Sequence, residues 1–542
     1  MKTRDLHKVS RLCVIFAITV SLNIGFLPVE GLASSPTPDS YHYSFTVDED
    51  GFTRAMVNFK SFKERGSSWV FVPKFSNWSR PVVSSGHISK HEVVETESVV
   101  DTKYYFYQVF RFWFVSDKSF RMSVQFNMSV GALIIEPRGM FFSPQIGFQE
   151  GSRGEAEVFF PHNSRVVEAV AIGRGGNYKP TERELNYVAF DLHENLIRLQ
   201  IEFKTSITTP ALSKLKQGIF TFQTVKRYEK HASNVLSLFS GVYNDFVDLF
   251  NVTLESVNVQ FFISEFHTFL SIGGYVPFTG GRMGDIHINI FFIRAVEGVL
   301  EVIALHELIH QFLWKAGLSP SDLLWFHEGM AQYVSIEIAD RLGYEGVQSE
   351  RDKLEKGASK FIEQYGENFH FLQQWKPEPQ PTNIATYYIA SHYVVSRLAG
   401  KYGGLNYYRR FFRLMKGGQI KDNNVLAYHL SLASDTSVAQ ALKRWGFNIV
   451  DLYAPPTYEA ERIIHDLNPI LQPYKFLAEY LYKQALIRFE KGDAEKANQY
   501  LAAAIFIAKF APTLTVATMG AILIAIIYTI ERQRASHFRS VV

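Results

Sequence analysis

Cysteine is almost absent from this sequence, because its 542 residues include only one, Cys13. No disulfide within the chain can be invoked, so any metal must be held by His, Asp or Glu side chains. An excess of charge is also missing, since 56 Lys and Arg stand against 53 Asp and Glu and the small surplus lies at the chain ends. A basic face for nucleic acid is therefore not implied, and no nucleic-acid partner is expected.

Apolar and aromatic residues are plentiful instead. Hydrophobic residues make up 47% of the chain and charged residues 20%, which excludes wholesale disorder. A chain of this length has room for about three domains. The 46 Phe, 27 Tyr and 7 Trp residues suit β-rich packing and point to no ligand by themselves.

The N-terminal end of the chain has the features of an export signal. Basic residues precede an apolar run from Leu12 to Leu27, and small residues follow it from Gly31 to Ser34. The run is only about 16 residues long, whereas a membrane-spanning helix needs about 20. We therefore predict a signal peptide over residues 1–33, with an uncleaved N-terminal anchor as the alternative.

A second apolar run lies near the C-terminus, where residues 511–530 form 20 positions without a charge. This length matches a membrane-spanning helix, and the arginines that follow at Arg532, Arg534 and Arg539 favour a cytoplasmic tail. We predict a transmembrane helix over 511–530, a basic cytoplasmic tail over 531–542 and a single-pass cell-membrane protein whose bulk is extracytoplasmic. A buried core helix and a removable lipid-anchor signal are the alternatives.

Residues 35–225 show the period-two pattern of β-strands. Large apolar side chains alternate with other residues from Tyr41 to Val47, from Phe110 to Phe114 and from Met122 to Met128. Several short strands at this spacing predict an all-β sandwich domain. The segment contains no cluster of chemistry-bearing residues, so we expect it to serve in packing, in spacing or in gating access of substrate.

After Lys226 the pattern changes to the three-to-four spacing of a helix. Apolar residues recur from Val235 to Phe250, and a strand-like run follows from Val257 to Phe262. A second alternation from Ile286 to Ile290 precedes a long helix-favouring stretch. The order helix, strand, strand, helix predicts a separate α+β domain over residues 226–415.

The rest of the chain before the membrane helix is predicted to be helical. Residues 416–470 form a mixed helical region, and residues 471–510 resemble one tetratricopeptide helical hairpin with Gly492 and Asp493 at its turn. One such unit cannot form a solenoid, so we predict a stalk or capping hairpin that leads to the membrane. Docking of a peptide on this hairpin is the alternative.

The segment that carries chemistry is His306-Glu307-Leu308-Ile309-His310. Two histidines four residues apart on a helix lie on one face, where both imidazoles can reach a single zinc ion. Glu307 sits beside that face and can take a proton from zinc-bound water. A surface helix that carries these residues by chance is the alternative, so the spacing alone is suggestive rather than decisive.

The next element can supply a third ligand. A helix stop and turn from Gly317 to Pro320 is followed by Trp325-Phe326-His327-Glu328-Gly329-Met330-Ala331. A second helix that returns past the first can offer Glu328 and leave the fourth position open for water, as catalytic zinc requires. With these two motifs the sequence resembles the gluzincin metallopeptidases, and particularly their aminopeptidase N-like branch, over about residues 230–415.

The resemblance implies a thermolysin-like α+β fold and roles for individual residues. His306, His310 and Glu328 would bind one zinc ion, and Glu307 would act as general base and then as general acid. His310 and Glu328 are separated by 17 residues, one fewer than the branch usually has. His327 is expected to point away from the metal and to have a supporting or structural role.

A further match lies in the helix-favouring segment from Tyr387 to Gly403. In the family a tyrosine opens this helix and stabilises the oxyanion, and the register that ends at Leu398 assigns this role to Tyr388. Tyr387 is the runner-up, and simple packing of both tyrosines at a helix start is the other alternative. A hydroxyl aimed at developing negative charge is worth about 3 to 4 kcal/mol.

One departure from the family concerns substrate binding. Aminopeptidases of this branch carry a G-x-M-E-N segment whose glutamate binds the free amine of the substrate. The corresponding residues here are Gly281, Met283, Gly284 and Asp285, with glycine in place of that glutamate. Asp285 is a candidate replacement, so exopeptidase and endopeptidase action both stay open. We expect Ile286 to Ile290 to form an edge strand that pairs with an extended peptide.

The sequence thus predicts a multidomain protein with an N-terminal all-β sandwich, a thermolysin-like α+β catalytic domain, a helical C-terminal region and a C-terminal transmembrane helix. Its predicted function is that of a membrane-anchored, extracytoplasmic zinc metallopeptidase acting on peptides or proteins. The alternative is a non-catalytic zinc-containing surface protein that binds protein or peptide partners. The intact Glu307 argues against that alternative, because a purely structural zinc site needs no base.

Overall fold

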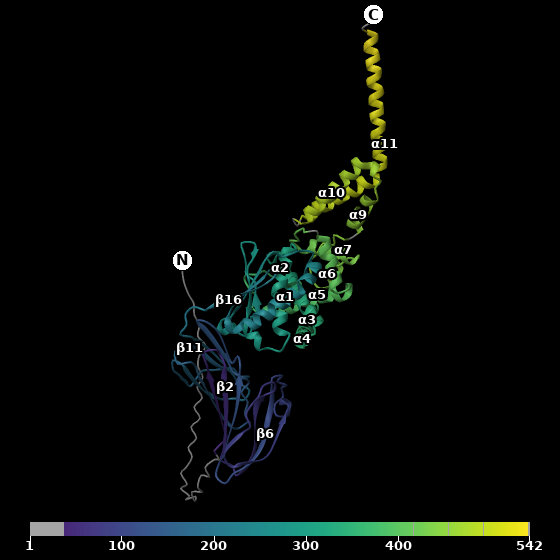
Figure 1. Ribbon diagram of the computed structural model, residues 1–542. Coiled ribbons are helices and arrows are strands. Elements are labelled where there is room, and N and C mark those ends of the chain that lie inside the picture. Colours follow the sequence, from purple (N-terminus) through teal and green to yellow (C-terminus); the bar gives the residue numbers. More distant parts are fainter. Residues whose placement is uncertain (1–36, 416, 454, 491–492, 540–542) are drawn as a thin grey trace, which may run out of the picture.

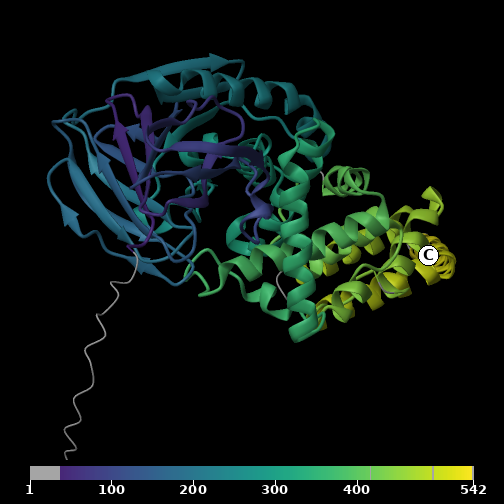
Figure 2. The ribbon, with the colours of Figure 1, turned by 90° about the horizontal axis from the view of Figure 1, so that it is seen from below.

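The protein has a β-rich N-terminal region, a helical C-terminal part and one long apolar helix at its end (Figure 1). The computed structural model describes residues 37–539 except 416, 454 and 491–492. The predicted signal peptide, residues 1–33, lies outside the described residues. Two views show the β-rich region on one side of the helices (Figures 1 and 2), and Figure 1 shows the long helix leading away from both.

The N-terminal region consists of short strands, as the period-two pattern predicts. They are β1 (Ser40–Val47), β2 (Thr53–Ser61), β3 (Arg65–Pro73), β4 (Val82–Ser85), β5 (His87–Val94), β6 (Tyr107–Val115), β7 (Phe120–Met128), β8 (Ala132–Ile135), β9 (Arg138–Phe142), β10 (Arg153–Phe159), β11 (Arg165–Ile172), β12 (Asn177–Tyr178), β13 (Glu182–Arg183), β14 (Tyr187–Leu192) and β15 (Arg198–Lys204). A seven-stranded sheet has the order β13-β14-β10-β1-β2-β7-β4, a five-stranded sheet the order β12-β11-β15-β9-β8, and a three-stranded sheet the order β3-β6-β5. Buried side chains from all three sheets share one core.

Strand β1 shows how the alternation produces this core. Tyr41, Tyr43 and Phe45 are buried, whereas His42 and Ser44 between them are partly exposed. The strand pairs antiparallel with β2 and parallel with β10, so it lies inside its sheet. Its apolar side chains therefore all point to one face, which packs against the core.

A further sheet supports the helical part of the chain. Its strands, in spatial order, are β16 (Leu212–Gln217), β17 (Phe220–Val225), β18 (Val257–Phe262), β22 (Ile286–Asn289) and β19 (Gly274–Tyr275). The first two lie within 35–225, the range predicted for the sandwich, yet they belong to this sheet, where β17 runs parallel to β18. A parallel pair needs a crossover, which α1 (Glu229–Phe250) supplies. Alternation alone does not tell which sheet a strand joins, so the pattern misplaced this boundary.

Helices pack around this sheet in one large apolar core. They are α2 (Val299–Lys315), α3 (Pro320–Arg341), α4 (Gly346–Tyr365), α5 (Ile384–Tyr402), α6 (Leu405–Met415), α7 (Asn423–Ser434) and α8 (Ala439–Arg444). The apolar stripe predicted for α1 is buried. The ring centroids of Phe246 and Phe250 each lie 5.5 Å from that of Phe312 in α2. A short hairpin of β20 (Phe278–Thr279) and β21 (Arg282–Met283) lies between β19 and β22 in the chain.

The C-terminal helices form a smaller unit with its own core. They are α9 (Pro455–Asp466), α10 (Gln472–Glu490) and α11 (Ala494–Arg539), and α10 packs back along the first part of α11. Of the two predicted turn residues, Gly492 lies outside the described residues, and Asp493 accepts a hydrogen bond from the Lys496 N–H at 3.2 Å. The hydroxyls of Tyr428 in α7 and Tyr482 in α10, 2.7 Å apart, link this unit to the core of the protein.

Helix α11 continues without interruption from the predicted hairpin, 471–510, into the predicted membrane helix, 511–530. The predicted boundary at residue 511 is therefore not a helix end. Within the described part of the chain, Glu495–Arg534 is the one helical segment with the length and composition of a membrane span, and it contains an 18-residue apolar window with a mean hydropathy of 2.1. Only 6% of that apolar window is buried, so the protein itself does not cover it.

His429 in α7 is a largely buried imidazole remote from the predicted site. Burial lowers its pKa from the ordinary 6.5 to about 4. Between pH 6.5 and about 4, His429 is protonated in the unfolded chain but neutral in the folded chain. The free energy of unfolding is therefore expected to decrease by up to about 1.4 kcal/mol for each pH unit by which the pH falls in this range. Urea denaturation of the full chain in detergent should therefore depend less steeply on pH for His429→Phe than for the unchanged protein. Equal slopes for the two proteins would contradict this role of His429.

Candidate metal and active site

Helix α2 carries three of the predicted site residues, His306, Glu307 and His310. Gly298 precedes the helix with a φ of 106°, and its N–H donates to the carboxylate of Glu301 at 2.8 Å. This bond satisfies a backbone donor at the start of the helix, where intrahelical partners are lacking. The histidine spacing then places both imidazoles on the same side of α2.

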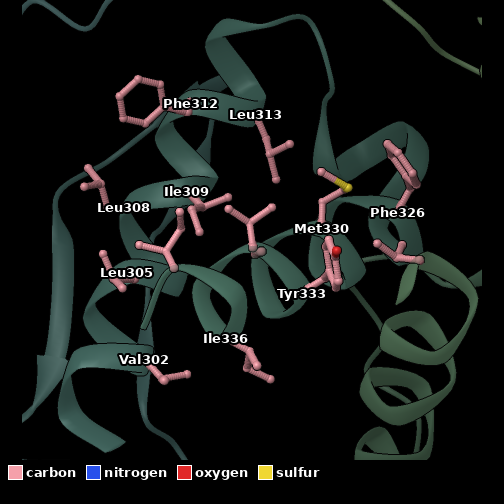
Figure 3. Packing of buried hydrophobic residues seen from close by; sticks show 14 of the residues in the cluster. Val302, Leu305, Leu308, Ile309, Phe312, Leu313, Phe326, Met330, Tyr333 and Ile336 are labelled. Atoms are coloured by element: carbon pink, nitrogen blue, oxygen red, sulfur yellow. The ribbon is translucent and has the colours of Figure 1, made fainter. Parts of the chain in front are cut away.

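Apolar packing and a tight turn bring α3 back along α2. Ile309 and Leu313 of α2 and Met330 of α3 are completely buried where the two helices meet (Figure 3). In the connection, Gly317 has a φ of 94°, and a Cβ there would lie 2.3 Å from the carbonyl oxygen of Gly418. The turn therefore requires glycine, both for its backbone conformation and for the close approach.

The two histidines of α2 converge with Glu328 of α3. Their Nε2 atoms lie 3.2 Å (His306) and 3.6 Å (His310) from Oε2 of Glu328, and the three ligand atoms lie within 4.8 Å of one another. Two ligands bound at about 2.1 Å to one tetrahedral ion are roughly 3.4 Å apart, which these distances approach. Two imidazoles with one carboxylate are also a donor set of catalytic zinc sites. The three residues can therefore hold a zinc ion.

The local electrostatics also suit a metal. Burial holds the pKa of His310 well below its ordinary value, so the ring is neutral, the form that binds metals. Burial acts in the same direction on His306, but the hydrogen bond to Glu328 and the charges of Glu307 and Glu328 outweigh it and raise the pKa of His306. A proton on His306 has to leave when a metal binds, because a ligating imidazole is deprotonated.

Glu307 lies next to the three ligand residues, and both it and His306 line the same cleft. Its side chain is buried, and its Oε2 atom has no hydrogen-bond partner among the described residues. Burial raises the pKa of Glu307 to about 8, whereas a cation bound nearby favours the ionised carboxylate. The other oxygen, Oε1, lies 2.7 Å from the position that a Cβ on Gly274 would take. The carboxylate is thus held against the backbone of β19.

Of the two candidate tyrosines, Tyr388 lines the cleft. The charge of Glu328, burial and the charge of Glu307 hold the pKa of Tyr388 well above its ordinary value, so its hydroxyl stays protonated and can donate. Tyr387 instead packs against the ring of Phe371, with the centroids 4.8 Å apart. The geometry therefore supports Tyr388 over Tyr387 as the hydroxyl that faces a substrate.

The structure corrects the expected orientation of His327. Its ring does not point away from the metal ligands but stacks on His310, with the centroids 4.8 Å apart and the planes 8° apart. His327 is 1% exposed, and burial lowers its pKa to about 3. Because α2 and α3 pack closely, neighbouring residues of α3 both reach α2, which one helical wheel does not reveal. The neutral ring of His327 supports the plane of the His310 imidazole.

The cleft has a volume of about 1060 Å³. Its walls come from the chain before α2, from β19 and from helices α2 to α5, and they include Gly273, Gly274, Phe292 and Gln332. Apolar walls with a few converging polar groups are typical of a ligand-binding cleft. The candidate metal ligands are therefore accessible to a substrate through His306.

The four residues predicted to bind substrate are not among the described residues that line this cleft. They are Gly281, Met283, Gly284 and Asp285. The carbonyl oxygen of Gly284 accepts a hydrogen bond from Gln311 Nε2 at 2.7 Å, and the exposed carboxylate of Asp285 accepts one from Asn258 Nδ2 at 3.1 Å. The structure thus places Asp285 in a surface contact, outside the residues that line this cleft.

The strand expected at the sheet edge is an interior strand. β22 pairs parallel with β18 on one side and antiparallel with β19 on the other, where Gly274 lies opposite Ile288. The edge is β19, which alternation within residues 286–290 cannot disclose because another segment provides the partner. The Gly273-Gly274 pair was the available signal, since glycine in a strand often marks the close approach of another group.

The β-rich N-terminal region also reaches the cleft. Tyr105 and Phe106, in the chain between β5 and β6, line its wall. The Tyr105 hydroxyl donates to Oε2 of Glu345, another wall residue, at 3.2 Å. The two partners are 240 residues apart in the chain, so no local pattern indicates this contact.

A methyl group on Gly274 is expected to displace the Glu307 carboxylate, because the added Cβ would lie 2.7 Å from Oε1 and also 2.8 Å from the carbonyl oxygen of His287 in β22. Gly274→Ala should therefore lower kcat for any reaction that uses Glu307 as a base by about 10- to 100-fold, with zinc binding retained. Steady-state kinetics and the zinc content of the purified protein test this.

Gly284→Ala is the matched control, because Gly284 belongs to the segment predicted from sequence to bind substrate. Its Cβ would meet Pro277 and not Glu307. A larger loss for Gly284→Ala than for Gly274→Ala would contradict the importance of the contact between β19 and Glu307.

The likeness of this chain to known proteins is structural. No family model matches the sequence, and no curated protein matches it. Among solved structures, the chain is similar to an M1 zinc metallopeptidase of Deinococcus radiodurans, a mutant crystallised with a Tyr-Ser-Ala substrate. The alignment covers 76% of this chain and 93% of that chain, with 15% sequence identity and a TM-score of 0.30. A likeness of this strength does not establish function, so the chemistry rests on the side chains of the site.

Proposed function

We propose that the protein is a zinc-dependent peptidase that hydrolyses peptide bonds in the cleft beside α2. The observation that carries this proposal is the convergence of His306, His310 and Glu328 next to a buried carboxylate, Glu307, that is left over as a base. A structural zinc site is usually closed by four protein ligands and needs no base. An open cleft in front of three ligands favours catalysis over a purely structural site.

His306, His310 and Glu328 would hold the one zinc ion. When bound, zinc supplies Lewis acidity that makes water a nucleophile near neutral pH and polarises a carbonyl group. The stacked ring of His327 keeps the His310 imidazole in its plane. The Nε2 atom of His306 and the Oε2 atom of Glu328 lie 3.2 Å apart, so both can reach the same ion.

Glu307 would carry the proton in both halves of the reaction. Its carboxylate takes a proton from the attacking water and then gives it to the nitrogen of the cleaved bond, so that the amine product leaves neutral. Burial and the contact with Gly274 hold the carboxylate at one place. Its free Oε2 atom, which has no partner among the described residues, is available for this exchange.

Tyr388 would donate a hydrogen bond to the carbonyl oxygen as negative charge develops on it. Loss of one such donor costs about 10²–10³ in kcat, so Tyr388→Phe is expected to lower kcat by this factor and to change KM little. Tyr387→Phe is the matched control, because the same change one residue earlier affects an aromatic contact outside the cleft. Steady-state kinetics of both variants, with circular dichroism to verify folding, test the assignment. Equal losses in the two variants would contradict it.

The substrate would lie as an extended chain along β19. An edge strand offers free backbone donors and acceptors to a peptide, and β19 places them beside Glu307. Residues 272–277 contain no carboxylate that could bind a free amine, and the cleft carboxylates Glu345 and Glu350 contact Tyr105 and Lys353. We propose that cleavage does not depend on a free amino terminus, which distinguishes this site from that of an aminopeptidase.

Helix α11 would anchor the peptidase in the cell membrane with the catalytic part extracytoplasmic. Residues 511–530 carry no charge, and Arg532 and Arg534 follow them on the side expected to face the cytoplasm. The predicted signal peptide, residues 1–33, would direct export. Peptide or protein substrates would then be met outside the cell, close to the membrane.

The test uses the full chain in detergent micelles, loaded with zinc and incubated with a pool of peptides that have free or acetylated amino termini. Mass spectrometry of the products is expected to show cuts within both kinds of peptide, and none after zinc is removed with a chelator. Stepwise loss of N-terminal residues from free peptides alone would support an aminopeptidase instead. A folded, zinc-bound chain that cuts nothing would favour a zinc-containing binding protein.

A further inference from the structure

We propose that the start of α10 inserts into the outer membrane surface beside α11, so that the protein is held by a wedge as well as by a span. The wedge consists of residues 468–480, which include the short turn before α10 and its first two turns. This inference rests on the proposed anchoring by α11. It adds to the single span a second contact, which would fix the orientation of the catalytic part relative to the membrane surface.

The length of the apolar helix supports the wedge. The hydroxyl of Tyr474 lies 2.5 Å from Thr518 Oγ1 and 3.3 Å from the carbonyl oxygen of Leu514, so the first turn of α10 contacts the predicted span. Ile530, the last residue of the uncharged run, is only 12 residues after Thr518, or about 18 Å of helix. The hydrocarbon core is about 30 Å thick, so it has to include the level of Tyr474.

Large apolar side chains of the wedge are exposed beside the polar residues Asn468 and Gln472. Ile470 is 81% exposed, Phe476 68% and Tyr480 49%. Phe510, at the same end of the helix pair on α11, is 47% exposed. In water these groups would form a costly apolar patch, whereas isoleucine, phenylalanine and tyrosine side chains are stabilised at the membrane interface.

The backbone of the turn is also suited to a region with little water. Pro469 and Pro473 have no N–H group. The N–H groups of Ile470 and Leu471 both donate within the turn, to the side chain and the carbonyl oxygen of Asn468, at 3.0 Å each. Backbone donors left free at this depth would each be costly, and these two are satisfied internally.

The charged groups at this end of the helix pair belong to Lys475 and to the end of helix α9. Lys475 donates to the carbonyl oxygen of Leu467 at 2.9 Å, and exposed His465 and Asp466 end helix α9 beside it. A long lysine side chain keeps its ammonium group at the polar layer while its stem stays apolar. Further along α10, the contact between Tyr482 and Tyr428 of α7 joins the helix that carries the wedge to the core of the protein.

The experiment places one fluorescent label at a time on the full chain in phosphatidylcholine vesicles. Cys13→Ser removes the native thiol, and Phe476→Cys, Asn498→Cys or Ile526→Cys provides the labelling site on the wedge, on the exposed far end of the helix pair or in the span. A nitrobenzoxadiazole label is quenched by lipids that carry a nitroxide, whichever way the protein faces. We expect the labels at 476 and 526 to be quenched several-fold more strongly than the label at 498.

Each other outcome overturns the inference in a distinguishable way. Strong quenching at 526 with 476 as weakly quenched as 498 would mean that α11 spans the membrane without a wedge. Weak quenching at 526 as well would mean that the proposed anchoring itself fails, while hydrolysis of peptides by the same sample would leave the peptidase proposal standing. A blue-shifted label at 476 that lipid does not quench, and whose shift grows with the protein-to-lipid ratio, would mean that a second copy covers the patch.

Discussion

Replacement of Glu307 by glutamine is expected to lower kcat for peptide hydrolysis by about 10²–10⁴-fold, the usual contribution of a general base. Glutamine has almost the same shape as glutamate but cannot take the proton of the attacking water. KM and zinc content should change little, because Glu307 is adjacent to the three converging ligands and is not one of them. The measurement combines steady-state kinetics on a peptide with the zinc content of the same preparation.

Glu301→Gln is the matched control for this variant. Glu301 lies on the same helix, and its carboxylate accepts a hydrogen bond from the N–H of Gly298 outside the site. The control is expected to keep its activity and to lose only some helix stability. A Glu307→Gln protein that is folded, holds zinc and hydrolyses peptides as fast as the control would contradict the assigned base.

Replacement of Glu328 by alanine is expected to have the second large effect, loss of the metal. Oε2 of Glu328 is the atom that both histidines approach, at 3.2 and 3.6 Å, so its removal opens the ligand set. Loss even of a group that only orients a ligand typically weakens zinc binding 10- to 100-fold, so loss of a ligand should exceed about 100-fold. Competition with a chelator of known affinity measures the zinc dissociation constant, and hydrolysis should fall in parallel.

Glu337→Ala is the control for Glu328→Ala. Both residues lie on α3, but the carboxylate of Glu337 pairs with Arg351 at 3.2 Å, away from the ligand set. Zinc affinity should be unchanged in this variant. Equal zinc affinity in the Glu328→Ala and Glu337→Ala proteins would mean that the carboxylate on α3 is not a ligand.

The local parts of the candidate site follow from sequence for a physical reason. Residues four apart on a helix share a face whatever the rest of the chain does, so the placement of His306 and His310 needs no tertiary information. Glu328 required one further assumption, that α3 returns past α2, and the turn at Gly317 makes that return. The structure brings the three side chains together as that assumption requires.

The parts that depend on pairing between distant segments did not follow from sequence. Alternation identifies a strand but not its neighbours, so the sequence did not indicate that β17 pairs with β18, and it predicted an edge position for β22, which is an interior strand. For the same reason the sequence did not indicate that Gly274 lies against Glu307. The orientation of His327 depended on how closely α2 and α3 pack, which no helical periodicity reports.

At the C-terminal end, hydropathy and structure contribute different information. Hydropathy locates an apolar helix and its charged flank, and α11 includes the whole of residues 511–530. It does not show that Tyr474, some 40 residues earlier in the chain, lies against Thr518 within that segment. The case for a membrane wedge therefore arises only from the paired helices.

The most direct test of the account is a titration of the metal-free full chain with zinc, during which peptide hydrolysis and bound zinc are measured together. The account predicts that activity rises with zinc in proportion to occupancy and reaches its maximum at about one ion per chain, as a single site with three protein ligands requires. The Glu307→Gln protein should bind the same amount of zinc and remain inactive. Hydrolysis that is complete before zinc is added, or a fully occupied chain that cleaves no peptide in the pool, would contradict it.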